Sequence, residues 1–120
     1  MAQFKIGVCE FSFPCRGPIA LGMAHEAGFE GVQIADCMGS DEAYPLLNPF
    51  VQDCYMKAAQ DYHVELQAMH LQRLFNQKFM KKAPGSEEGK SARTSLKNAA
   101  AACRQMGIPT IMVTITQILN

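Results

Sequence analysis

Apolar residues recur along the chain in short runs separated by segments of helical periodicity. The first run, residues 4–13, is rich in apolar side chains and is followed by Pro14, which predicts a buried strand. Residues 31–37 and 64–71 form two more short apolar runs of the same kind. Residues 110–115 are rich in β-branched side chains. The pattern therefore predicts four strands.

The first segment between strands predicts a helix over residues 18–27. Proline suits the first turn of a helix, and Ile19, Met23 and Ala27 repeat at the spacing of one helical face. Gly28 follows at the position where helices often end in a left-handed residue. We expect this face to be buried.

Two further helices are indicated by their end signals. Asn48 before Pro49 marks the start of the second helix, and Ser86 followed by acidic residues marks the start of the third. Gly107 and the proline two positions later end the third helix. The predicted buried stripes are Val51, Cys54, Ala58 and Tyr62 in the second helix and Ala92, Leu96, Ala99, Cys103 and Met106 in the third.

The element order is β-α-β-α-β-α-β, and three right-handed crossovers favour a parallel sheet. Two architectures fit this α/β order. One is a flavodoxin-like doubly wound sheet, with helices on both faces. The other is the first half of a (β/α)8 barrel, with all helices outside. Long connections follow the second and third predicted strands, as in barrel enzymes, but open sheets share this tendency.

Composition narrows the functional classes. The 120 residues are 48% hydrophobic and carry a formal net charge of zero, which is typical of a globular domain and disfavours a nucleic-acid partner. The N-terminus lacks a signal-peptide pattern, and no apolar run is long enough to span a membrane. The five cysteines include no C-x-x-C pair and are expected to be free thiols. These features predict a cytoplasmic protein.

Four segments carry a family resemblance. Residues 4–13, which read FKIGVCEFSF, and residues 27–34, which read AGFEGVQI, resemble the first two strands of the xylose isomerase-like superfamily of sugar phosphate isomerases and epimerases. Residues 66–70, LQAMH, are similar to the third strand of this family, and residues 101–113 to its passage into the fourth. The resemblance implies that residues 1–120 are a single unit, the N-terminal half (strands 1–4) of a TIM barrel from a longer enzyme.

The resemblance also implies a divalent metal (Mn, Mg or Co), but the family holds it with ligands on later strands. No metal ligand is therefore assigned here, and the family's second-strand glutamate is replaced by Gln33. The implied function is that of a sugar or sugar-derivative isomerase or epimerase, with this half forming the wall of the substrate pocket. Alternatives are a dehydratase or C-glycoside-cleaving lyase, a non-catalytic half-barrel, and an endonuclease IV-like nuclease, which the charge balance disfavours. Whether the 120-residue chain is itself an enzyme stays open.

The candidate substrate-binding residues are His70, Glu10, Asp36 and Gln72, which fall near predicted strand ends. An imidazole at His70 could bind a hydroxyl or move a proton near neutral pH, or it could be satisfied by a neighbouring carbonyl. Glu10 and Asp36 could face each other as an acid/base pair. A loop cap or an ion pair with Arg16 or Arg73 is the more common role of such carboxylates.

A half-barrel would expose two unpaired sheet edges. We therefore expect self-association or pairing with a complementary half-barrel, with no nucleic-acid or membrane partner. A folded monomer would favour the flavodoxin-like alternative.

Overall fold

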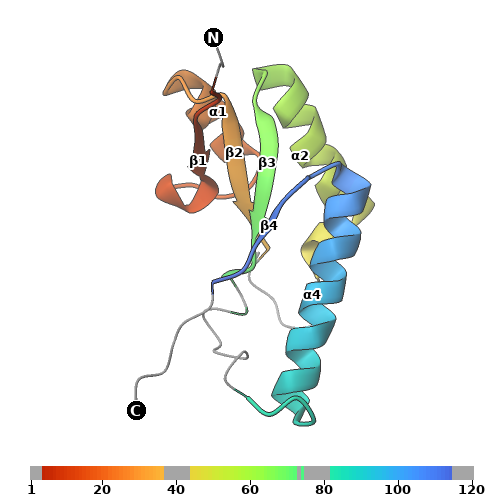
Figure 1. Cartoon of the computed structure of the whole chain (residues 1–120). Helices are drawn as coiled ribbons and strands as arrows, with labels where there is room; N and C mark the ends of the chain where they lie inside the picture. The colour runs from red at the N-terminus through yellow and green to blue at the C-terminus, as the bar shows by residue number, and fades with distance from the viewer. Residues whose placement is uncertain (1–3, 37–43, 73, 75–81, 115–120) are drawn as a thin grey trace, which may run out of the picture.

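The computed structural model describes residues 4–36, 44–72, 74 and 82–114. Within them the chain forms an α/β fold with a four-stranded parallel sheet and three α-helices (Figure 1). The elements are β1 (Gly7–Cys9), η1 (Glu10–Ser12), α1 (Ile19–Glu26), β2 (Gly31–Ala35), η2 (Pro45–Leu47), α2 (Pro49–Tyr62), β3 (Glu65–His70), α4 (Glu87–Met106) and β4 (Ile111–Met112). The predicted β-α-β-α-β-α-β order and the parallel sheet are confirmed.

The strands follow each other in chain order, β1-β2-β3-β4. A doubly wound sheet reverses its direction once, and no reversal occurs among these four strands. Successive right-handed crossovers in one direction place every helix on the same face of the sheet. Consistent with this, residues from α1, α2 and α4 share one buried core with β2 and β3, and α2 and α4 run along the same side of the sheet in Figure 1.

The predicted helix ends are confirmed, because each depends on local chemistry. The Asn48 side chain accepts a hydrogen bond from the Phe50 N–H at 2.9 Å and caps α2. Ser86 caps α4 in the same way by accepting from the Gly89 N–H at 3.1 Å. Gly28 and Gly107 have φ values of 87° and 69°, so both adopt the left-handed conformation expected after a helix.

The first strand is shorter and less buried than predicted. β1 ends at Cys9, and a 3-10 turn follows where residues 10–13 were expected to continue the strand. Phe4 and Ile6 are 85% and 64% exposed. Two causes account for this difference. β1 is an edge strand with a neighbour on one side only, and the chain turns at Glu10 because that side chain points into the core.

The predicted buried faces of α1 and α2 were wrong in part. Ile19 is 60% exposed and Tyr62 is 42% exposed, while Leu21 and Tyr55 are fully buried. Each of these helices packs on the sheet and on the other helix, so its orientation depends on two contacts that its own periodicity does not encode. In α4 the prediction held better: Ala92, Ala99, Cys103 and Met106 are buried, and only Leu96 is exposed.

The sheet face opposite the helices carries its own side-chain contacts. Gln33 of β2 accepts from the Cys9 thiol at 3.4 Å, and its amide lies 3.7 Å from the Met112 sulfur of β4. Gln67 of β3 lies over Gly7 and Gly31, where a Cβ atom would overlap its amide. Side chains on this face therefore reach across an intervening strand.

Candidate functional site

Glu10 is the centre of a buried hydrogen-bond network at the carboxyl end of β1. Its carboxylate, 1% exposed, accepts from the Gly17 N–H, from the Ala35 N–H at 2.8 Å and from the Tyr55 hydroxyl at 2.6 Å. Burial, the Glu10 charge and this hydrogen bond raise the pKa of Tyr55 far above its ordinary value, so the phenol stays protonated. Glu10 thus ties the loop before α1, the end of β2 and helix α2 together.

This geometry agrees with the loop-cap interpretation of Glu10. The donors that surround the carboxylate are held by the chain itself, so the observed contacts assign Glu10 a positioning role. Its role in substrate binding stays a prediction.

Asp36 lies one residue beyond β2 and is 2% exposed. Its carboxylate accepts from the Tyr44 hydroxyl at 3.4 Å, and its backbone N–H donates to the His70 carbonyl at 3.0 Å. The structure therefore brings Asp36 beside the end of β3. The contacts given above for Glu10 and for Asp36 involve different residues, and an acid/base pair between the two carboxylates stays a prediction.

His70, at the end of β3, is the one candidate with an unsatisfied polar atom among the described residues. The side chain is 7% exposed, and its Nε2 lies 3.1 Å from the Thr114 hydroxyl. Its Nδ1 is buried without a hydrogen-bond partner. The Phe11 ring lies beside the imidazole, with ring centroids 5.8 Å apart. An unpaired buried nitrogen costs about 1–3 kcal/mol, so a hydrogen-bond partner at this atom would be stabilising.

Gln72 follows β3 and is contacted by the exposed Arg16, whose guanidinium donates to the amide oxygen at 3.5 Å. No ion pair seen in the described part of the chain includes Arg16. Arg73, the other arginine considered as a carboxylate partner, lies outside the described residues.

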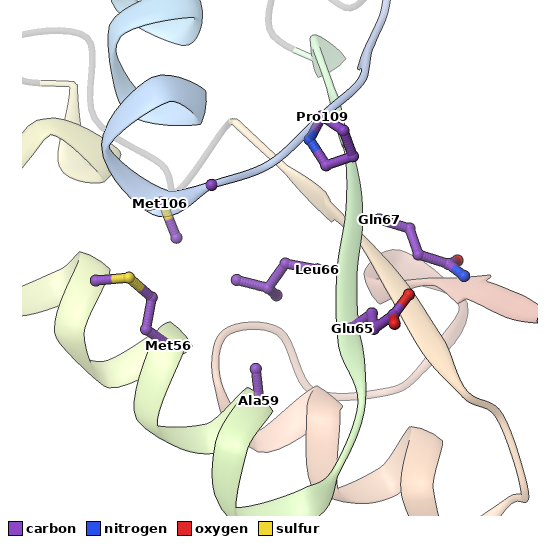
Figure 2. A pocket seen from close by; sticks show the side chains of 8 residues that line it. Met56, Ala59, Glu65, Leu66, Gln67, Met106 and Pro109 are labelled. Carbon is purple, nitrogen blue, oxygen red and sulfur yellow. The ribbon is translucent and has the colours of Figure 1, made fainter.

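A pocket lies elsewhere (Figure 2). It has a volume of about 410 Å³ and opens at the amino end of β3, between that strand and the ends of α2 and α4. Met56, Ala59, Leu66 and Met106 point into it in Figure 2, whereas Gln67 points away. None of the four candidate residues lines it. Because the pocket is mostly apolar and has no convergent polar groups, we place the candidate site at the strand carboxyl ends instead.

Four residues of the site were missed in the sequence: Tyr55, Tyr44, Thr114 and Phe11. Tyr55 carried a usable signal, because a tyrosine within an apolar helical segment needs a hydroxyl partner when it is buried. The other three lie in turns or at strand ends, where periodicity gives no signal.

The described residues do not form a metal site of their own. No three His, Cys, Asp or Glu side chains among them lie close enough to hold an ion. The Glu10 carboxylate is already occupied by three donors. A metal of the kind that the resemblance implies would need ligands from outside this set, and no chemical step is assigned to it here.

None of the described helices is long and apolar enough to cross a bilayer. A scan against models of known protein families gives no match, and a search of curated protein sequences gives none either.

Proposed function

We propose that this chain forms the first half of a (β/α)8 barrel and supplies the wall of a pocket for a sugar or sugar derivative. The function class is that of an isomerase, epimerase or related lyase. In this proposal His70 is the main ligand-binding group of the half-barrel.

The observation that carries the proposal is the buried, unpaired Nδ1 of His70 at the carboxyl end of β3. Active sites of (β/α)8 barrels lie at this end of the strands. The Thr114 contact holds the other ring nitrogen, so the ring presents Nδ1 in a fixed orientation. A sugar hydroxyl can both donate and accept, and it can therefore pair with either tautomer of the ring. Phe11 offers an apolar ring beside the same imidazole, which suits the C–H face of a sugar.

The barrel architecture is supported by the strand order, because four parallel strands follow each other in chain order without a reversal. Gln67, the residue at the register shift of β3, lies over Gly7 and Gly31, and Gln33 reaches Met112 across β3. Long side chains on the face opposite the helices therefore reach across a neighbouring strand, as side chains do inside a barrel.

The chemistry of the chain's own residues is limited to binding and orientation. Glu10 fixes the loop before α1 and the end of β2, and Asp36 is thereby held next to His70. The imidazole of His70 can bind a hydroxyl or take part in proton transfer with it.

The proposal is tested by NMR observation of the imidazole nitrogens during titration with D-fructose and D-xylulose. We expect the Nδ1 resonance of His70 to shift and the resonances of His25, an exposed residue, to stay unchanged. His70→Gln should abolish the backbone shifts near β3, and His25→Gln should preserve them. Equal responses in both variants, or no response of His70 to any sugar, would contradict the proposal.

A further inference from the structure

Among the described residues, the sheet has two edges without a neighbouring strand and one face without a helix. β1 and β4 each pair with a single described strand, and all four strands run in the same direction. The face opposite the helices carries Gln33, Met112 and Gln67, and Met112 is 40% exposed. All-parallel sheets usually have both faces covered, and an unpaired edge can pair with a strand of another chain, so this face and both edges are candidate contact surfaces.

The pairing rules restrict what the partner can be. It must place one strand parallel to β1 and another parallel to β4 at the same time. A second copy of this chain, rotated by 180° about an axis along the strands, meets both requirements, because its β4 meets β1 while its β1 meets β4. The formal net charge of zero adds no repulsion between two copies.

The side chains of the open face are self-complementary under this rotation. Barrel interiors are filled by layers of four side chains from alternate strands. Gln33 of β2 and Met112 of β4 supply two members of one such layer, and the rotation adds the partner's Gln33 and the partner's Met112 on the opposite side of the axis. In the layer below, Gln67 alternates with Gly7, so large and small residues fit together across the axis.

We propose that two copies of this chain close into one eight-stranded barrel, with β1 of each copy paired to β4 of the other. Both copies of His70 then face the same mouth, and each half of the pocket is completed in trans. This inference rests on the half-barrel architecture proposed above and not on the sugar chemistry.

The test is the mass of the full chain in sedimentation equilibrium, with three lysine variants. We expect the wild type to have twice the 13.2 kDa chain mass. Met112→Lys places a charge inside the closed layer, whereas in a single chain the same position is partly open to water, so we expect a folded monomer. Ile6→Lys, 64% exposed beside the β1 edge, should weaken the dimer without a core change. Phe50→Lys, 73% exposed on α2, is the matched control and should stay dimeric.

Circular dichroism shows whether each variant is folded. A folded wild-type monomer, or an open-ended polymer instead of a dimer, would overturn the inference. The inference would also be overturned if Phe50→Lys weakened the dimer as strongly as Ile6→Lys does. The result is separable from the sugar titration, since a dimer that binds no sugar refutes only the proposed function, and a monomer that binds sugar refutes only the paired barrel.

Discussion

The hydrogen bond between Tyr55 and Glu10 offers a direct test of how this fold is held together. Tyr55→Phe removes one hydroxyl and keeps the ring that fills the core. The hydroxyl donates to a buried carboxylate at 2.6 Å, and both side chains are inaccessible to water. After the substitution, water cannot readily replace the lost donor.

The expected loss follows from the number of donors that remain. A hydrogen bond to a charged group contributes about 1.5–3 kcal/mol. Two backbone N–H groups, of Gly17 and Ala35, still stabilise the carboxylate, so we expect Tyr55→Phe to lower the free energy of unfolding by about 2 kcal/mol. Glu10→Gln weakens all three bonds and turns an amide donor toward N–H groups, so it should cost more, about 4 kcal/mol.

The assay is urea unfolding followed by circular dichroism at pH 7 and at one protein concentration. A loss of 2 kcal/mol corresponds to a midpoint lowered by about 1 M urea. Tyr62→Phe is the control, because that ring is 42% exposed and its hydroxyl has no role in the network, and it should change stability by less than about 0.5 kcal/mol. If Tyr55→Phe behaves like Tyr62→Phe, or if Glu10→Gln is the milder change, the carboxylate is not the link described here.

Three further outcomes follow from burial. The pKa of Tyr55 is raised in the folded protein, so the stabilisation by its protonated hydroxyl is complete below a pH of about 10, the ordinary pKa of tyrosine, and is lost as the pH rises further. Wild-type stability should therefore fall in alkali. Tyr55→Phe should reduce this fall in urea unfolding measured over a series of pH values. Gly31→Ala should cost less than about 1 kcal/mol, because its Cβ displaces only the flexible end of Gln67, and Gln67→Ala should remove this cost in a double-mutant cycle. Burial raises the pKa of the Cys103 thiol, so mass spectrometry should find iodoacetamide on exposed Cys15 well before Cys103, and equal rates in the native state would contradict the described core.

Sequence predicted the parts of this fold that are set by neighbouring residues. Asn48 and Ser86 cap helices through their own side chains, and the glycines that follow α1 and α4 take positive φ angles because no Cβ opposes them. The order of strands and helices follows from such local signals. The parallel sheet follows from this order, whereas the sequence left both the doubly wound and the half-barrel architecture open.

The site was less predictable because its contacts join residues distant in sequence. His70 was a candidate because it lies at a strand end. The surroundings of its ring include Thr114, 44 residues later in the chain, and Phe11, 59 residues earlier. Glu10 was expected at the mouth of the site, and its inward turn depends on Tyr55, 45 residues away. No periodic pattern encodes these separations.

The small residues of the sheet, including its glycines, are explained by the long side chains that lie on the face opposite the helices. Gly7 and Gly31 make room for Gln67, and Ala68 lies between Gln33 and Met112, whose side chains meet across it. A sheet covered by helices on this face would favour bulky apolar residues at such positions, as β2 shows on its helix side with Val32 and Ile34. Small residues alternating with long polar ones instead suit an interior in which side chains from facing strands share one layer. The two faces of the same sheet thus carry different chemistries, with apolar side chains toward the helices and a mixture of small and long side chains on the opposite face.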